Sequence, residues 1–312
     1  MHIPDGYLDL STAVGTFALA GAGLAAAARH VRARLKEATL PMMGLMSAFI
    51  FAGQMVNFPI AGGTSGHLLG AAMASVFLGP WAAMLVMATV IFVQCLFFQD
   101  GGITALGANL LNLAVVAPWV ARALFGLTRW VAPQPRFLPA AAGIAGFGSI
   151  LAAAILCCLE LIASETARAS TVLPVMTVLH AVIGLVEGVL TAGLVSFVVR
   201  LRPDLIASTA VVSADEATAS EGAGWRRPAW VLAALVGAAL LAAPWASENP
   251  DALEAVGGRL QLVESTPSAP GPLANYSVAG VGASAGTALA GALGSGLAFG
   301  CAWLLLRRLK RP

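Results

Sequence analysis

Long apolar runs separated by short polar segments dominate the pattern along this chain. A helix needs about 20 mostly apolar residues to cross the hydrocarbon core of a bilayer, so the pattern predicts an all-α polytopic membrane protein with about nine transmembrane helices. The predicted spans cover residues 10–29, 39–57, 67–80, 81–98, 103–128, 137–163, 171–200, 228–246 and 276–306. The third and fourth are short, and the sequence leaves open whether each crosses the bilayer fully.

A polar stretch at residues 202–227 interrupts this pattern and is typical of a linker. Seven of the predicted spans precede the stretch and two follow it. We therefore predict a first transmembrane domain at residues 1–201, a cytoplasmic linker at 202–227, and a second domain at 228–312. In the second domain, two helices are joined by an extracytoplasmic loop.

The scarcity of charge supports the membrane assignment. Only 10% of the residues are charged, whereas a soluble domain carries roughly a quarter. A net charge of +2 without a basic tract argues against a nucleic-acid partner. The cysteines form no CxxC pair, so we expect small buried apolar side chains rather than disulfides or metal ligands. These cysteines are Cys95, Cys157, Cys158 and Cys301.

Basic residues indicate the orientation. With the N-terminus outside, all of the 17 basic residues except Arg168 and Arg259 lie on the cytoplasmic side. The opposite orientation would violate the positive-inside rule. We therefore predict an N-out, C-in, multi-pass protein of the cell membrane. The residues before the first apolar run lack the basic start of a signal peptide, so we expect the mature chain to begin at Met1.

The first two residues offer metal-binding chemistry. The Met1 amine, the deprotonated Met1–His2 amide and the His2 imidazole Nδ1 would form fused chelate rings in one plane. Square-planar nitrogen ligation suits Ni(II) or Cu(II), and Co(II) less strictly. A fourth nitrogen is needed, and His67 is a candidate because its Gly-rich stretch lies on the same predicted face as Met1. Glycines allow such a loop to fold back toward membrane depth.

Four segments in the same order resemble the CbiM/NikM family. They are residues 1–6 (MHIPDG), 63–67 (GTSGH), 99–109 (QDGGITALGAN) and 180–188 (HAVIGLVEG). Members of this family are the metal-specificity (S) components of energy-coupling-factor (ECF) transporters for cobalt and nickel. Residues 249–254 (NPDALE) are similar to the PDGLE signature of the small accessory N component, with Ala252 in place of glycine. The chain thus resembles an M–N fusion, a form more common for nickel.

The resemblance implies ligands, partners and a mode of action. Ni(II) or Co(II) would be the transported substrate, with no permanent cofactor, and Met1, His2 and His67 would be its ligands. The partners would be a transmembrane coupling (T) component, cytoplasmic ATPase subunits and membrane lipid. The absence of a P-loop or HExxH motif agrees with a transporter subunit that is not an enzyme. Residues expected near the metal or along its pathway are Asn57, Ser65, Gln94, Gln99, Asp100, Asn109, Asn112, His180 and Glu187.

Several alternatives stay open at this point. Nothing in the residues separates nickel from cobalt decisively, so a cobalt importer component that feeds cobalamin synthesis is one alternative. A standalone secondary permease for divalent metals is another. His180 and Glu187 stand seven residues apart, close to two helical turns, and therefore share one helix face. Their role is either support of the metal site or a hydrogen bond that packs the helix.

Overall fold

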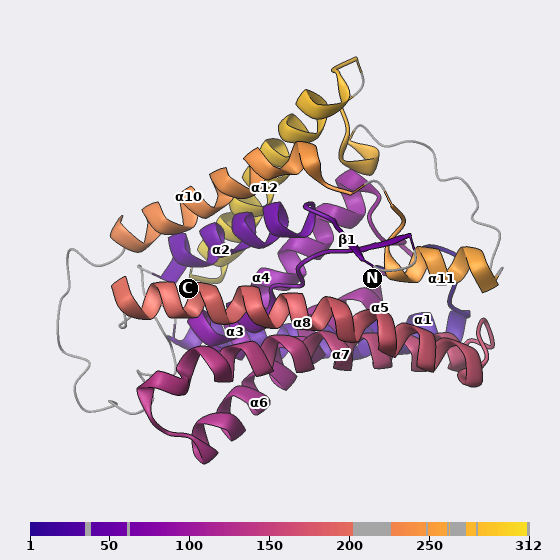
Figure 1. Cartoon of the computed structure of the whole chain (residues 1–312), viewed down its shortest axis with the longest axis horizontal. Helices are drawn as coiled ribbons and strands as arrows, with labels where there is room; N and C mark the ends of the chain where they lie inside the picture. The colour runs from indigo at the N-terminus through magenta and orange to yellow at the C-terminus, as the bar shows by residue number, and fades with distance from the viewer. Residues whose placement is uncertain are drawn as a thin grey trace.

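Helices form almost every element of the computed structural model, and most run along one long axis (Figure 1). The structure describes residues 1–34, 39–60, 63–201, 226–247, 249–260, 262, 273–278 and 280–310. This architecture confirms the predicted all-α polytopic class. The predicted linker at 202–227 lies outside the described residues, except that Arg226 and Arg227 begin a helix.

Six helices in the described part of the chain are long and apolar enough to cross a membrane. Three of them are α-helical throughout: α1 (Leu10–Arg34), α8 (Ala169–Leu201) and α12 (Ala283–Lys310). α7 (Leu138–Ala163) follows a single turn of 3-10 helix. The others contain π-helical stretches: α4 (Pro80–Val93) continues through Gln94–Phe98, and α5 (Leu106–Asn109) continues through Leu110–Val116 into α6 (Ala117–Val131). α2 (Thr39–Gln54) and α10 (Arg226–Ala242) are shorter, with 16 and 17 residues.

The third predicted span, at residues 67–80, is not a membrane-length helix. Only α3 (Ala71–Leu78) forms there, and its eight residues extend about 12 Å. Gly70 precedes it with φ 78°, a left-handed conformation that a glycine adopts without strain. Gly79 follows it with φ 79° and leads directly into the proline that begins α4. The two glycines therefore break one apolar run into an extended entry, a short helix and a sharp turn.

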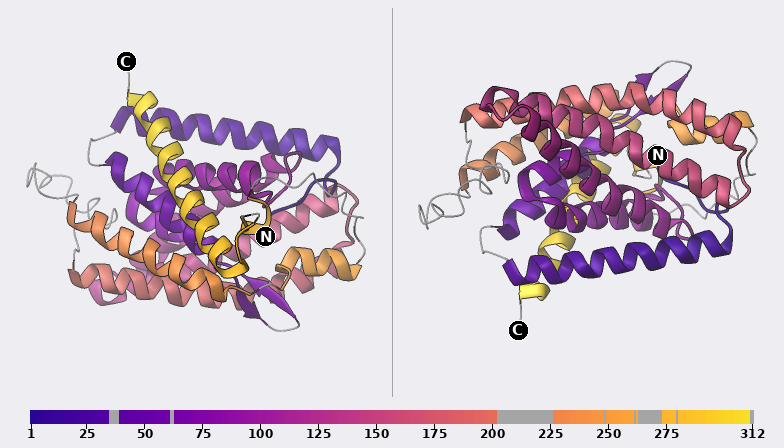
Figure 2. Two further views of the ribbon diagram at one scale, coloured as in Figure 1. Left: turned by 90° about the horizontal axis from the view of Figure 1, so that it is seen from above. Right: turned by 90° about the horizontal axis from the view of Figure 1, so that it is seen from below.

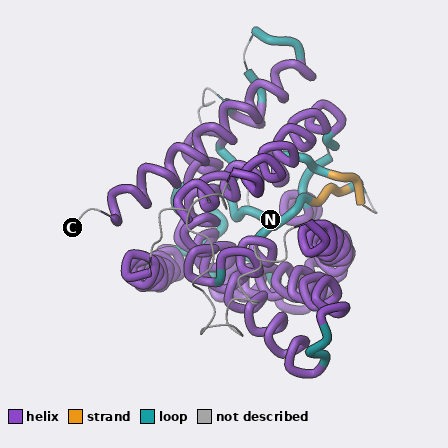
Figure 3. Tube along the Cα trace, turned by 90° about the vertical axis from the view of Figure 1, so that its left-hand side faces the viewer, coloured by secondary structure: helices purple, strands orange, loops and turns teal. Residues whose placement is uncertain are grey.

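An antiparallel hairpin precedes α3. β1 (Phe58–Ile60) pairs with β2 (Thr64–Gly66) in the register Phe58↔Gly66. Figure 3 looks along the bundle and shows this hairpin on one flank, beside the loops that approach Met1. The hairpin and the extended residues after it carry His67 into the bundle.

α7 and α8 lie antiparallel and side by side across one face of the bundle (Figure 1). Their glycines allow the two backbones to approach: a Cβ on Gly143 would lie 2.9 Å from the carbonyl oxygen of Gly188, and a Cβ on Gly188 would lie equally close to that of Gly143. Small residues at such contacts are typical of helix packing in lipid, where close van der Waals contact drives association.

The C-terminal segment packs directly on the rest of the protein. α10 and α12 lie against α2, and α12 also contacts α4 (Figure 2). α11 (Ala252–Leu260) lies near β2 and α8. Buried residues of α12, such as Ala290 and Ala298, belong to the same apolar core as the first seven predicted spans. The predicted division at residue 202 therefore separates segments of sequence that share one core.

The C-terminal ends of α1, α8 and α12 lie at the end of the bundle that is away from Met1 (Figures 1 and 2). Arg32, Arg34 and Arg200 lie in the last turns of α1 and α8. This grouping fits the charge pattern, while the orientation across a membrane stays a prediction. Cys95, Cys157 and Cys158 are buried as expected, but the expectation is wrong for Cys301, which is exposed on α12.

Candidate metal centre

The first three residues of the chain lie in the interior of the bundle (Figure 3). Met1, His2 and Ile3 are 7%, 4% and 0% exposed. The side-chain amide of Asn109 clamps Ile3: the Ile3 N–H donates to Oδ1 at 2.8 Å, and Nδ2 donates to the Ile3 carbonyl at 3.1 Å. Buried backbone groups need such partners. This clamp explains how an extended terminus is kept inside a helical protein.

Two adjacent glycines allow a loop to enclose this terminus. The N–H of Gly102 donates to the carbonyl of Ile3 at 2.9 Å, and a Cβ on Gly102 would lie 2.2 Å from the backbone nitrogen of Asp5. Gly101 has φ 93°, and a Cβ there would lie 3.0 Å from the Cβ of His2. Side chains fit at neither position, so the glycines permit the close approach.

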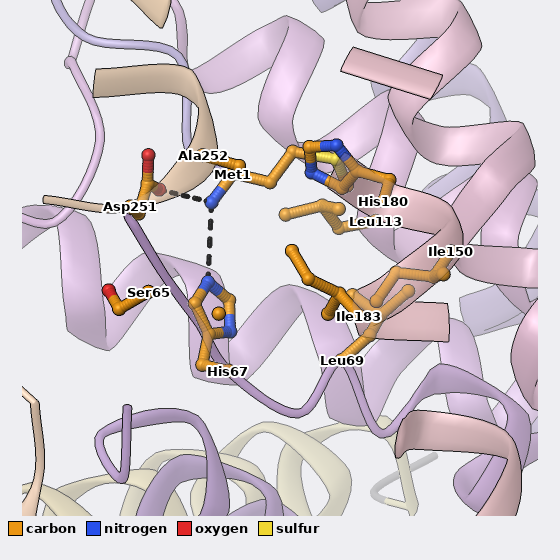
Figure 4. Close-up of a pocket in the computed structure, with 11 residues that line it drawn as sticks. Met1, Ser65, His67, Leu69, Leu113, Ile150, His180, Ile183, Asp251 and Ala252 are labelled. Atoms are coloured by element: carbon orange, nitrogen blue, oxygen red, sulfur yellow. Dashed lines mark hydrogen bonds and ion pairs between the residues drawn. The ribbon is translucent and has the colours of Figure 1, made fainter. Parts of the chain in front are cut away.

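The amine of Met1 faces the imidazole of His67, with 3.2 Å between Met1 N and His67 Nε2 (Figure 4). His67 Nδ1 lies 3.0 Å from the carbonyl oxygen of Leu68. Because a carbonyl oxygen only accepts hydrogen bonds, Nδ1 carries the proton and Nε2 directs a lone pair toward the amine. Burial, with the charges of the amine and His2, lowers the pKa of His67 to about 4. The imidazole is therefore neutral at pH 7 and available as a ligand.

Two aspartates hold the nitrogens of the first two residues. Asp251 accepts a hydrogen bond from the Met1 amine (Figure 4). Asp100 Oδ1 lies 2.6 Å from His2 Nδ1, and the second carboxylate oxygen of Asp100 accepts from the hydroxyl of Tyr276. The rings of His2 and His67 stack with centroids 5.8 Å apart.

These neighbours shift the pKa of the charged groups. Burial acts to lower the pKa of the Met1 amine, but Asp251, together with Asp100 and Glu254, raises it above its ordinary value. Burial acts to raise the pKa of Asp251 and of Asp100, but the amine lowers the first and His2 lowers the second below the ordinary range. The centre therefore stabilises a positive charge between carboxylates, at a point where burial alone would disfavour it.

Asp251 reaches this centre because its segment docks beside His67. The N–H of Ser65 donates to the carbonyl of Pro250 at 2.9 Å, and the Ser65 hydroxyl donates to the carbonyl of Asn249 at 2.8 Å. The N–H of Glu254 donates to Asp251 Oδ1 at 2.8 Å, which orients the carboxylate. Asp251 was not among the site residues expected from the sequence. The sequence signal that could have identified Asp251 is its position in the segment at residues 249–254, which is similar to the PDGLE signature.

The buried side chains of Gln54 and Glu187 form hydrogen bonds with the backbone that follows His67. Gln54 Nε2 donates to the carbonyl of Leu69 at 2.7 Å, and Gln94 Nε2 donates to Gln54 Oε1 at 2.7 Å. From the other side, Glu187 accepts the N–H groups of Leu69 at 2.8 Å and Gly70 at 3.0 Å. These bonds hold the loop that carries His67.

The structure brings only some of the expected pathway residues to the centre. Ser65, Asp100 and Asn109 contact the residues around Met1 and His2, and His180 lines the pocket. Asn112, in contrast, donates from Nδ2 to Glu160 Oε2 at 2.7 Å in a separate buried pair. The backbone carbonyl of Asn57 accepts from the N–H of Ser247, and the side chain of Gln99 is exposed.

A pocket joins the amine to the interior of the bundle (Figure 4). Its lining residues are Met1, Ser65, Gly66, His67, Leu69, Leu113, Ile150, His180, Ile183, Asp251 and Ala252. In the described part of the chain, no group of three or more His, Cys, Asp and Glu side chains is arranged to hold a metal. A metal bound here would need donors from the chain terminus in addition to imidazoles.

The positions of the nitrogens fit such a donor set. Nitrogen ligands about 2.0–2.1 Å from a metal and at right angles to each other lie about 2.9 Å apart. The Met1 amine and His67 Nε2 stand 3.2 Å apart, close to that spacing. His2 Nδ1 faces Asp100 in this structure, so it would have to exchange this carboxylate for the metal.

The pentapeptide GASAG at residues 282–286 matches the GxSxG pattern of hydrolase nucleophiles. That motif requires a strand, a sharp turn and a helix in succession. Here Gly282 directly precedes α12 and the other four residues, the serine included, belong to that helix, while the element before it is a single turn of 3-10 helix at Ala274–Tyr276. The surroundings therefore do not support a hydrolase site.

Comparisons with known proteins place the chain among metal-transport proteins. The family CbiM, described as "Cobalt uptake substrate-specific transmembrane region", matches residues 2–205. A protein of Archaeoglobus fulgidus with the provisional name fused nickel transport protein NikMN is 39% identical over 98% of each chain. The fused nickel transport protein NikMN of Rhodobacter capsulatus is 40% identical over 69% of this chain and 67% of its own.

More distant relatives carry related names. The cobalt transport protein CbiM of Geobacter sulfurreducens is 32% identical over 75% of this chain and 68% of its own. A crystal structure described as a transition metal transporter superposes with a TM-score of 0.60 and 33% identity, covering 65% of this chain and 95% of the other.

Proposed function

The chain belongs to the CbiM family, and from this premise we propose that it is the substrate-binding component of an ATP-driven importer for Ni(II), with Co(II) as the alternative substrate. It is a multi-pass membrane transport protein rather than an enzyme. The observation that carries the proposal is the buried Met1 amine, which faces the lone pair of His67 Nε2 at 3.2 Å.

The proposed ligands are four nitrogens: the Met1 amine, the His2 backbone amide, His2 Nδ1 and His67 Nε2. A neutral imidazole at His67 and a planar chelate at the terminus together complete a square of nitrogen donors, which suits Ni(II). The proposal requires that the mature chain carry a free amine at Met1.

Loading the site requires two exchanges of partner. The Met1 amine must lose a proton and leave Asp251, and His2 Nδ1 must leave Asp100 with its lone pair free. The amide nitrogen between Met1 and His2 must also lose its proton, so at least two protons leave the site as the divalent ion enters. Both carboxylates then remain beside the bound cation and balance its charge. Tyr276 and Glu254 hold these carboxylates in place by hydrogen bonds, so the same groups that hold the amine are suited to attract a divalent cation.

Nickel is preferred as the substrate on two grounds. A planar four-nitrogen site favours Ni(II) over Co(II) by the general order of metal affinities. A relative that matches 98% of this chain and a second relative with a fused name both carry nickel in their names. Cobalt stays the alternative because more distant relatives are named cobalt transport proteins.

Energy would come from partner subunits, a coupling protein in the membrane and cytoplasmic ATPases, because the sequence contains no P-loop. The competing function is a permease that works alone. Uptake of radioactive nickel in cells with and without the partner subunits separates the two. Uptake that is unchanged without the partners would rule out the ATP-driven role.

The ligand set is tested by extending the N-terminus. One alanine placed before Met1 moves the amine out of the chelate, so the nickel dissociation constant measured by titration calorimetry should rise by roughly 100-fold or more, a loss of about 2.7 kcal/mol. His67→Gln should have a similar effect, and the same extension at the C-terminus should have none. Mass spectrometry of the mature protein confirms its first residue. Native affinity in the extended protein would refute the chelate.

A further inference from the structure

His180 stands in the pocket that leads inward from the Met1 amine. It lies on α8, is 1% exposed, and lines the same pocket as Met1, His67 and Asp251. In Figure 4 the side chain of Met1 extends from its amine toward the side of the pocket where His180 lies. The residue that offers the amine therefore also borders His180.

The hydrogen bonding of His180 leaves one nitrogen available. His180 Nδ1 lies 2.8 Å from the carbonyl oxygen of Met176, one turn earlier on α8, and must donate its proton to it. Nε2 therefore carries a lone pair. This atom is buried and has no hydrogen-bond partner among the residues that the structure describes. Leaving a buried acceptor unpaired is unfavourable, so such an atom calls for an explanation.

Further polar residues continue from His180 along one face of α8. Glu187 and Thr191 follow at intervals of about two and three helical turns, and both are at most 1% exposed. The hydroxyl of Thr191 is also buried without a partner among the described residues. This face runs from the pocket toward the end of α8 that carries Arg200.

We propose that His180 Nε2 is a second metal station, which binds the ion after it leaves the nitrogens of Met1, His2 and His67. The proposal rests on the proposed function, since it assigns the next step to the same substrate. Imidazole is a ligand of the same kind as His67, so Ni(II) or Co(II) accepts it without a change of donor class. One imidazole among apolar side chains binds more weakly than four nitrogens. A station from which the ion must leave again needs such weak binding.

Two readouts on the full chain test the station. The first is nickel binding by titration calorimetry with purified protein. The second is the initial rate of radioactive nickel uptake in cells that also produce the coupling and ATPase subunits. The test variant is His180→Gln, which keeps a polar amide of similar size but offers no imidazole. The control is His30→Gln, because His30 lies near the far end of α1 and stacks on Trp81 instead.

His180→Gln should retain nickel affinity within about threefold and lose uptake by about tenfold. His30→Gln should change neither quantity. Native uptake in His180→Gln would overturn the station and leave His180 as a packing residue. Loss of equilibrium binding as severe as in His67→Gln would also overturn it, because His180 would then belong to the first site. If His67→Gln itself binds nickel normally, the proposed function fails first.

A spectroscopic measurement tests the station independently of uptake, in case His180→Gln lowers uptake only because the variant folds poorly. In a background that carries both His2→Ala and His67→Gln, which removes both imidazoles of the first site, excess Co(II) should give visible ligand-field absorption from imidazole coordination at His180. This absorption should disappear when His180→Gln is added to the same background. Its persistence in the triple variant, or its absence from the background, would refute the station.

Discussion

Glu187 is expected to control metal affinity without touching the metal. Its carboxylate accepts the N–H groups of Leu69 and Gly70 at 2.8 and 3.0 Å, directly after His67 in the chain. The side chain is 1% exposed, so no solvent replaces it when it is removed. Glu187→Ala therefore leaves two backbone donors buried without an acceptor.

The magnitude follows from these two bonds. A buried donor left without a partner costs about 1–3 kcal/mol, so Glu187→Ala should destabilise the His67 loop by about 2–6 kcal/mol. Glu187→Gln retains one acceptor oxygen and should cost about half as much. When the binding-competent loop is only partly populated, the apparent dissociation constant rises in proportion, by tenfold for each 1.4 kcal/mol. If Glu187→Ala raises the free energy of the binding-competent loop by about 2 kcal/mol relative to its other conformations, nickel binding weakens roughly 30-fold.

Titration calorimetry of nickel binding, with thermal unfolding of the same samples, measures both effects. Glu160→Gln is the matched control, because Glu160 is also a buried carboxylate but its hydrogen-bond partner is Asn112 rather than the backbone after His67. We expect both variants to lower the unfolding temperature, and only the Glu187 variants to weaken nickel binding. Native affinity in Glu187→Ala, or equal weakening in Glu160→Gln, would refute the reasoning.

Three further predictions address the terminus and its surroundings. Asp251→Ala removes the carboxylate that accepts a hydrogen bond from the Met1 amine, so an acylating reagent should modify this amine faster than in the unmodified protein. Mass spectrometry measures the rate of acylation, and an unchanged rate would contradict the contact. Gly102→Ala should abolish nickel binding, since its Cβ would lie 2.2 Å from Asp5 N, whereas Gly126→Ala, which meets open space, should bind normally. The carboxylate of Asp9 caps α1 by accepting hydrogen bonds from Ser11 and Thr12, and these bonds lower the pKa of Asp9 in the folded protein. The ionised carboxylate therefore stabilises the folded protein at pH values above the ordinary aspartate pKa of about 3.9. This stabilisation is lost as the pH falls from there through the lower pKa of the folded state. The difference in melting temperature between the protein and Asp9→Ala should therefore be constant above about pH 5 and shrink below pH 4; a constant difference throughout would refute it.

The sequence by itself determined the class of the fold. Apolar runs of membrane length form helices wherever they occur, because a lipid-exposed backbone must satisfy its hydrogen bonds within the segment. The same rule failed at residues 67–80, where hydropathy predicted a span and the structure has the eight-residue α3. Hydropathy indicates whether a segment is buried in an apolar environment, but it does not indicate where the backbone turns. Here the backbone turns at Gly70 and Gly79, which both have a positive φ.

The sequence also identified the main candidate ligands, because an N-terminal Met1–His2 pair carries its chelating geometry within two residues. It could not identify their partners. Asp251 contacts the Met1 amine across 250 residues of sequence, and Tyr276, which is also C-terminal to residue 225, contacts Asp100. The partner of Asn112, Glu160 on α7, is likewise distant, 48 residues away in the sequence. A pattern of residue types is local, whereas these contacts depend on how distant helices pack, and only the tertiary structure decides that.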